Sequence, residues 1–233
     1  MTMATAEPLF DRGDWWDEGA RAFASLRSVT TFRLELLRQW LPQGFAGRTV
    51  VDLGCGGGLL AVPLAREGAH VVGLDLAAKA LRAAVAQQPE RLLAAQADLQ
   101  ELPLAERSAD VVLLADVLEH VDDPAAVVAQ AARVLRPGGA LFVNTIHRTL
   151  RSRVFAIALG EGLGFIPRGT HQWRKFVRPD ELDTMAHAAG LVRVQRAGEA
   201  PRLWATLRAG AVVLRPSKSL AVGYAALFQK VHR

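Results

Sequence analysis

The chain has 233 residues, 51% of them hydrophobic, which is enough to bury a full core. Its formal net charge is +5, but a composition rich in Ala, Leu and Arg also produces an arginine excess, so we expect no nucleic-acid partner. The single cysteine, Cys55, excludes an internal disulfide framework and favours the cytoplasm. There is neither a secretory signal pattern nor a stretch of the roughly 20 apolar residues that span a membrane.

Helical and strand patterns alternate along most of the chain. Residues 31–41 repeat apolar side chains at helical spacing, which predicts a helix within an N-terminal arm, 1–47. Short apolar runs predict strands at 49–53, 70–74, 92–97, 109–115, 140–145, 191–197 and 219–231. Further helices are expected at 59–66, 77–87, 124–135 and 179–189. This order predicts one α/β domain, 1–233, with a seven-stranded, mostly parallel sheet and helices on both faces.

An insertion, 146–177, follows the fifth predicted strand, at the edge of the sheet where binding specificity is usually placed. It holds an apolar group consisting of Val154, Phe155, Ile157, Ala158, Leu159, Leu163, Phe165 and Ile166. Basic residues flank that group at Arg148, Arg151, Arg153 and Arg168. Such a segment suits peripheral contact with an anionic membrane, while the alternative is a lid over the active site.

The first predicted strand runs into a glycine-rich turn, Asp52-Leu53-Gly54-Cys55-Gly56-Gly57-Gly58. Glycines let the backbone approach a ligand closely, and the turn alone leaves open an NAD-type oxidoreductase or a non-catalytic nucleotide-binding module. The next strand ends in Asp75, about 20 residues further on, where a carboxylate would accept from a ribose diol. The pair predicts a nucleoside-containing cofactor.

Further residues extend this nucleoside site. Asp98, after the third strand, is placed to bind an adenine amino group, with Leu76 and Leu99 on the ring faces. The strand that contains Asp52 and the turn that contains Gly54, Cys55 and Gly56 look like those of Rossmann-like class I methyltransferases. That resemblance implies S-adenosylmethionine as the cofactor.

Three other segments narrow the resemblance: Trp15-Trp16-Asp17, Asp116-Val117-Leu118-Glu119-His120-Val121 and Gly169-Thr170-His171-Gln172-Trp173-Arg174-Lys175-Phe176. Together they resemble the ubiquinone-biosynthesis O-methyltransferases, which act on polyprenyl catechol and demethylubiquinol intermediates. The resemblance implies that Arg33, Gly54, Asp75 and Ala115 contact the cofactor, with Arg33 at its carboxylate. It also implies a small aromatic or polyprenyl-phenol substrate and O-methylation.

The chain departs from this family at Leu26-Arg27, Thr30-Thr31 and Gly223. In the family, a Leu-His pair, an Asn-Pro pair and an Asn before the tyrosine stand there. The alternative is therefore a methyltransferase of a specialised aromatic metabolite, acting on oxygen, nitrogen or carbon.

Methyl transfer from a sulfonium is an in-line displacement, which requires positioning of the reactants and deprotonation of the hydroxyl. His171 is the first candidate base and His120 the second. Asp116, Glu119 and His120 share one face of a helical turn, and resemblance to eukaryotic members implies that Glu119 and its neighbours hold Mg²⁺ or another divalent cation. The alternative is that they only begin a helix. Trp173 either stacks on the substrate or anchors the insertion.

Overall fold

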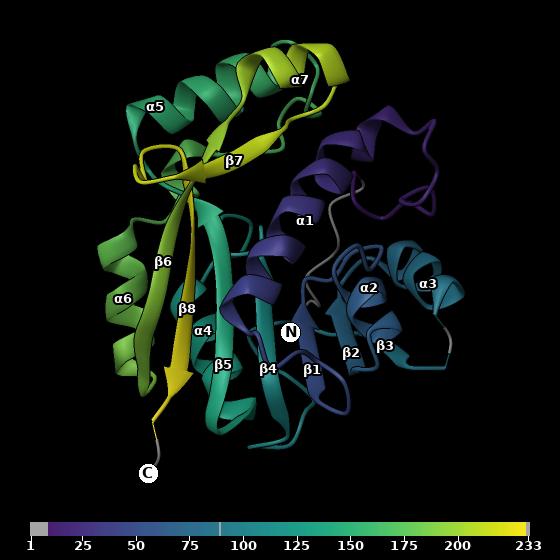
Figure 1. Ribbon diagram of the computed structural model, residues 1–233, viewed down its shortest axis with the longest axis vertical. Coiled ribbons are helices and arrows are strands. Elements are labelled where there is room, and N and C mark those ends of the chain that lie inside the picture. The colour runs from purple at the N-terminus through teal and green to yellow at the C-terminus, as the bar shows by residue number, and fades with distance from the viewer. Residues whose placement is uncertain (1–8, 89, 232–233) are drawn as a thin grey trace.

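The computed structural model describes residues 9–88 and 90–231. One eight-stranded sheet with the order β3-β2-β1-β4-β5-β8-β6-β7 runs through the molecule (Figure 1). The strands are β1 (Thr49–Leu53), β2 (His70–Asp75), β3 (Leu92–Gln96), β4 (Ala109–Ala115), β5 (Leu135–Ile146), β6 (Leu191–Pro201), β7 (Leu214–Ser217) and β8 (Gly223–Lys230). β1 to β5 pair in parallel, whereas β8, β6 and β7 extend the sheet in antiparallel fashion.

Helices cover both faces of the sheet, and the strand residues alternate between them. Val51, Val112 and Leu141 point into a core with α4 (Pro124–Val134) and α6 (Pro179–Ala188). Their neighbours Val50 and Val111 point into a second core, with α1 (Arg21–Trp40) and α2 (Ala61–Arg66). This alternation follows from the two-residue repeat of a strand, and burial on both faces explains the continuous apolar runs. α3 (Ala78–Gln87) packs against β3.

The Rossmann-like fold predicted from the sequence, with helices on both faces of a mostly parallel sheet, is confirmed, with one strand more than expected. The additional strand, β7, is short, contains Pro216 and lies at the sheet edge, so it carries no alternating apolar pattern. The first helix begins at Arg21 rather than at Thr31, because Phe23 and Val29 bury apolar surface although its middle is rich in Ser and Thr. Gly138 and Gly139 lie inside β5, where its register with β4 shifts, rather than before the strand.

Three chain segments meet beyond the carboxyl ends of the parallel strands: the insertion, the excursion between β6 and β7, and the start of α1 (Figure 1). The insertion forms α5 (Leu150–Ser152), the π-type helix η1 (Arg153–Glu161) and η2 (Trp173–Lys175), and the excursion between β6 and β7 forms α7 (Leu203–Ala209). Ser25 on α1 joins them: its hydroxyl donates to the Phe165 carbonyl (2.6 Å) and accepts from the Val212 amide (2.9 Å). None of the helices in the described part of the chain could cross a membrane.

Candidate active site

A cavity of about 560 Å³ lies under these segments, at the carboxyl ends of β1, β2 and β4. Every residue predicted to bind the cofactor lines it: Arg33, Asp52, Gly54, Cys55, Gly56, Asp75, Leu76, Asp98, Leu99 and Ala115. His120 and His171 line it too. Parallel strands place their carboxyl ends along one edge, which brings together residues that are far apart in the sequence.

Asp75 fixes the glycine turn at the end of β1. One of its carboxylate oxygens accepts from the Gly56 amide (2.8 Å) and the other from the Ala77 amide (2.9 Å). Gly54 and Gly56 have φ of +73° and +49°, which non-glycine residues rarely adopt. Asp75 is only half-buried, so its carboxylate reaches the cavity while it holds the turn. This arrangement can receive a ribose.

Trp15 packs against the same turn and also lines the cavity. A Cβ on Gly57 would lie 2.3 Å from Trp15 Cγ, so only glycine permits this close packing. Trp15 also stacks on Phe23 at 4.3 Å between ring centroids, and Trp16 Nε1 donates to the Gly57 carbonyl (2.7 Å). The two tryptophans therefore seal the glycine turn with the N-terminal arm. Beneath it, burial raises the pKa of Asp52 to about 7, and the nearby Asp75 adds to the shift.

Arg33 reaches the cavity from α1 and is 6% exposed. Its guanidinium donates to Asp116 and, at 3.3 Å, to Oε2 of Glu199. Burial lowers the pKa of Arg33, but the two carboxylates more than offset this effect and leave it above its usual value. Asp116 has a φ of +53°, a strained conformation for a non-glycine residue, and also accepts from Asn144 Nδ2 (3.1 Å). Arg33 is thus held as a cation at the end of β4.

His171 carries the arrangement expected of an oriented base. Its Nδ1 lies 3.0 Å from Oε1 of Glu161, and the Glu161 carboxylate also accepts from the amides of His171 (2.9 Å) and Gly169 (2.7 Å). The ring lines the cavity, and its second nitrogen, Nε2, has no hydrogen-bond partner among the described residues. The His120 ring lies 5.9 Å from that of His171, and burial, with His171 nearby, lowers the pKa of His120 to about 4. His120 is therefore neutral at pH 7 and a weak base.

The structure does not assemble the metal site predicted at Asp116, Glu119 and His120. In the described part of the chain, no three His, Cys, Asp or Glu side chains are grouped so that they could hold a metal ion. Asp116 pairs with Arg33, and Glu119 is 2% exposed, is not among the residues that line the cavity and accepts from Thr145 Oγ1 (2.8 Å). Asp116 and Glu119 lie on one turn, but their side chains bind different partners, Arg33 and Thr145.

Burial and the nearby Asp116 raise the pKa of Glu119 to about 8. This acid keeps its proton in the folded state between pH 4.5 and 8 but loses it when unfolded, so it makes the free energy of unfolding fall as pH rises through that window. We predict that Glu119→Gln, which mimics the protonated acid, stabilises the protein by on the order of 3 kcal/mol at pH 9 and not at pH 4. Denaturant unfolding of both proteins across this range measures the difference, and parallel curves would contradict it.

Two predictions about the insertion have different outcomes. Trp173 lies outside the residues that line the cavity, and its Nε1 donates to the Thr149 carbonyl (2.9 Å), so it anchors the insertion and does not stack on a substrate there. Phe155, Phe165 and Ile166 line the cavity as expected of a lid.

The Glu161 partner of His171 was not predicted, although it is the only acid from 147 to 178. Glu199 was also missed, and no sequence pattern marks it.

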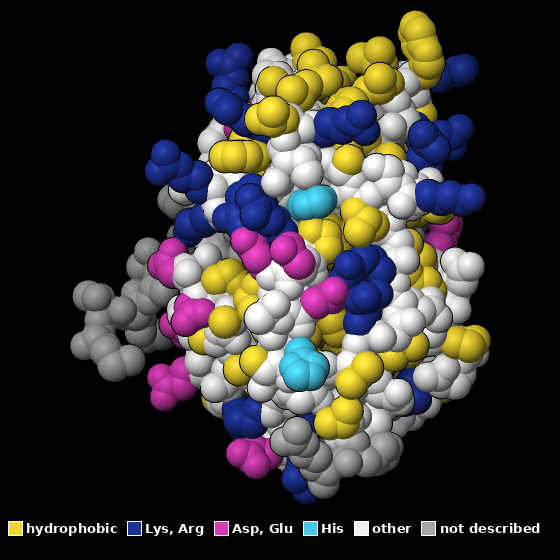
Figure 2. All heavy atoms as spheres, turned by 90° about the vertical axis from the view of Figure 1, so that its left-hand side faces the viewer, with side chains coloured by type: hydrophobic (Ala, Val, Ile, Leu, Met, Phe, Trp, Pro, Cys, Tyr) yellow, Lys and Arg dark blue, Asp and Glu magenta, His cyan; other side chains and the backbone are white. Residues whose placement is uncertain are grey.

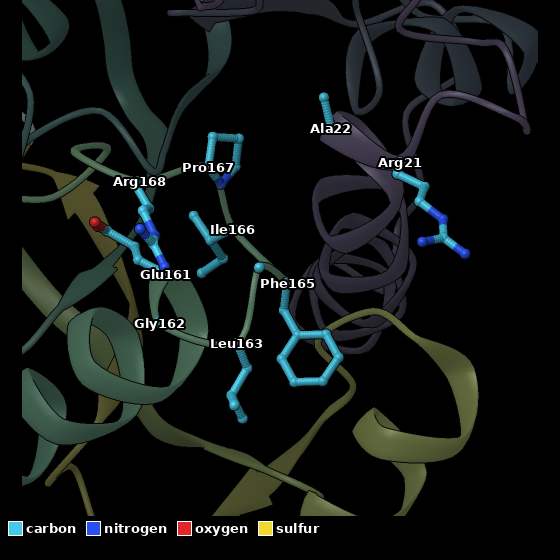
Figure 3. Close-up of a pocket in the computed structure, with 10 residues that line it drawn as sticks. Arg21, Ala22, Glu161, Gly162, Leu163, Phe165, Ile166, Pro167 and Arg168 are labelled. Carbon is cyan, nitrogen blue, oxygen red and sulfur yellow. The ribbon is translucent and has the colours of Figure 1, made fainter.

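A second, smaller cavity of about 370 Å³ opens outside the lid (Figure 3). It lies between the first turn of α1, at Arg21 and Ala22, and the segment from Glu161 to Arg168 (Figure 3). Ala22, Phe165, Ile166 and Pro167 line both cavities, so the two lie next to each other.

Comparisons with known proteins agree with this geometry. The methyltransferase domain family matches residues 51–143. The chain is 42% identical over 191 residues to "Ubiquinone biosynthesis O-methyltransferase" of Ralstonia nicotianae, which covers 79% of this chain and 78% of that protein. A Thermotoga maritima methyltransferase, described as a possible histamine N-methyltransferase, has a TM-score of 0.70 at 20% identity over 95% of this chain and 98% of that one. Magnesium protoporphyrin IX methyltransferase from Synechocystis, with bound S-adenosylhomocysteine, has a TM-score of 0.64 at 19% identity over 90% and 85%.

Fold, glycine turn and family match together define a class I S-adenosylmethionine-dependent methyltransferase. S-adenosylmethionine is its cofactor, and the NAD-type oxidoreductase that the glycine turn alone left open is disfavoured. The identity to the Ralstonia enzyme, which extends over most of both chains, identifies one family within this class. The chain belongs to the family of ubiquinone biosynthesis O-methyltransferases.

Proposed function

We propose that this enzyme methylates a phenolic hydroxyl of a quinone precursor, with His171 as the base. The Glu161–His171 pair at the cavity carries the proposal, because the carboxylate fixes Nδ1 and leaves Nε2 to take a phenolic proton. In other enzymes too, a histidine that a buried acid orients acts as a general base. His120 is the weaker candidate, since a base with a pKa of about 4 is far from neutral pH.

S-adenosylmethionine supplies a methyl group on a positively charged sulfur. In this proposal, Arg33 binds the carboxylate of its methionine end, Asp75 the ribose, and Leu76 and Leu99 the adenine, since all four residues line the cavity. His171 removes the phenolic proton, the oxygen forms a bond to the methyl carbon, and the carbon–sulfur bond breaks. The products are the methyl ether, neutral S-adenosylhomocysteine and a proton on His171. The residues predicted to bind a metal do not fit one, so no step is assigned to a metal.

Product analysis tests the proposed acceptor. The protein is incubated with S-adenosylmethionine and, separately, with catechols, a short-chain demethylubiquinol and unrelated phenols, and the products are identified by mass spectrometry. O-methylation of the demethylubiquinol or catechols is expected. Methylation restricted to an unrelated phenol, or to nitrogen or carbon, would instead support an enzyme of specialised aromatic metabolism.

We also propose that the enzyme meets its substrate at a membrane surface, since a polyprenyl phenol resides in a bilayer. Large apolar side chains of α5, η1 and α7 and of the segment after η1 are exposed, with Trp204 at 85%. The others are Leu150, Val154, Leu163, Leu203 and Leu207. Hydrophobic side chains gather at this end of the molecule with Lys and Arg around them (Figure 2). Apolar residues enter the acyl boundary while arginines meet anionic headgroups, each contributing about 1 kcal/mol.

Liposome flotation tests this contact. We expect the protein to float with vesicles that contain anionic lipid, less so at high salt, and to lose binding in the double variant Arg151→Glu, Arg153→Glu. Both arginines are exposed, whereas Arg148 pairs with Glu181 and is left unchanged. The matched control reverses two exposed arginines of α2 and α3, Arg66 and Arg82. Protein that stays soluble with anionic vesicles at low salt would contradict the proposal and favour a soluble phenol.

A further inference from the structure

His120 brings to the cavity an imidazole that the proposed reaction does not use. It follows the carboxyl end of β4 and lines the cavity, where the ring of Phe10 meets it edge-on at 5.7 Å between centroids. Neither ring nitrogen has a hydrogen-bond partner among the described residues, and neither is among the fully enclosed polar atoms. The contact with Phe10 therefore holds the ring while both nitrogens stay available to a ligand.

His120 lies close to the proposed base. The ring of His171 lines the same cavity, and the two ring centroids are 5.9 Å apart. An oxygen that is hydrogen-bonded to an imidazole lies roughly 4 Å from the centroid of that ring. Because two such distances together exceed 5.9 Å, one oxygen between the rings can contact both. A phenolic oxygen that gives its proton to His171 is then within reach of His120.

The charge state of His120 suits it to donate a hydrogen bond. Burial lowers its pKa to about 4. Of the charged groups that act on it, His171 and Lys175, from the insertion, lower the pKa, whereas Asp116, after β4, raises it. A neutral imidazole still carries one N–H. It can stabilise an anionic oxygen without adding a second positive charge beside a protonated His171.

We propose that a ring nitrogen of His120 donates a hydrogen bond to the phenolic oxygen while His171 removes the proton of that oxygen. His120 is then a catalytic residue that stabilises the negative charge developing on the oxygen before it bonds to the methyl carbon. The phenolic proton passes to His171, and His120 keeps its own proton throughout. The inference rests on the proposed function, since it requires a phenolic acceptor in this cavity.

The test compares kcat for catechol in the wild type, in His120→Phe and in His120→Gln. Phenylalanine keeps a ring against Phe10 but has no donor, whereas glutamine keeps an N–H donor and cannot act as a base. Loss of one such donor lowers kcat by about 10²–10³ in a well-studied hydrolase, so we expect at least a tenfold fall in His120→Phe and partial recovery in His120→Gln. The exposed His187→Phe, on α6 and outside the cavity, should keep the wild-type kcat.

A more acidic acceptor separates stabilisation of charge from a displaced site. A nitro-substituted catechol is already ionised in weakly alkaline solution, so less negative charge develops on its oxygen during the reaction. The loss of kcat in His120→Phe should therefore be smaller with this acceptor than with catechol, whereas a displaced site would lower both equally. Calorimetric binding of S-adenosylhomocysteine, which should stay unchanged, checks the fold of each variant.

The outcomes separate the inference from the proposed function. If the wild type methylates neither acceptor nor any other phenol, the proposed function fails, and the inference fails with it. If the wild type methylates catechol, three results overturn only the role of His120: full kcat in His120→Phe, equal losses with the two acceptors, or a loss in His120→Gln as large as in His120→Phe. His120→Ala replaces His120→Phe if the latter does not bind S-adenosylhomocysteine. Failure of both to bind would mean that His120 supports the fold, which also overturns the inference.

Discussion

His171→Ala is expected to lower kcat by about 10² or more while changing the affinity for S-adenosylmethionine little. The reason is the position of the ring: it lines the cavity, Nδ1 is held by Glu161, and no residue that the structure describes hydrogen-bonds to Nε2. A catechol hydroxyl keeps its proton at neutral pH, and removal of the base leaves that proton to water. Stopped or continuous assays give kcat, and isothermal calorimetry gives cofactor affinity.

Glu161→Gln supplies the matched variant for this prediction. The amide keeps the size of the side chain but no longer offers two carboxylate oxygens to the amides of Gly169 and His171 and to the ring. We expect a smaller loss of kcat than in His171→Ala, because the imidazole remains while its orientation is less fixed. Equal losses would indicate that Glu161 mainly holds the insertion together, which thermal unfolding of the variant would show.

Full activity in His171→Ala would show that His120 or a metal, and not His171, promotes removal of the proton. Exhaustive chelation separates these two, because activity that survives it eliminates the metal. Loss of activity on chelation, with recovery on addition of Mg²⁺, would mean that Asp116, Glu119 and His120 rearrange when ligands bind. The structure gives the opposite expectation, since these side chains are engaged elsewhere.

The sequence predicted those parts of the site that follow from local pattern. The glycine turn and Asp75 each follow a strand, and strand ends in a parallel sheet share one edge, so residues such as Asp98 and Ala115 reach the same cavity. The strand runs were recognisable because burial on both faces makes them continuously apolar. Boundaries were less predictable where packing outweighs propensity, as in the first half of α1.

Long-range partners could not be predicted from pattern. Arg33 is 83 residues from Asp116 and 166 from Glu199, and nothing in the spacing of one specifies the others. The structure does not assemble the predicted metal group for the same reason: proximity along one turn did not show that Arg33 and Thr145 engage two of its members. Polar contacts of this kind depend on which elements the fold brings together, whereas periodicity reports only which face of an element is buried.

Asp75→Ala is expected to weaken binding of S-adenosylhomocysteine at least tenfold, since two charge-assisted hydrogen bonds to a ribose are worth roughly 1.5 to 3 kcal/mol. Asp75 also holds the amides of Gly56 and Ala77, so part of any loss could come from a displaced glycine turn. A cycle with an analogue that lacks both ribose hydroxyls separates the two contributions, because damage to the turn weakens both ligands alike. We expect the analogue to bind the wild type and Asp75→Ala with similar affinity, whereas S-adenosylhomocysteine binds the variant much more weakly. Equal losses for both ligands would assign Asp75 to the turn alone, and unchanged calorimetric affinity would remove it from the cofactor site.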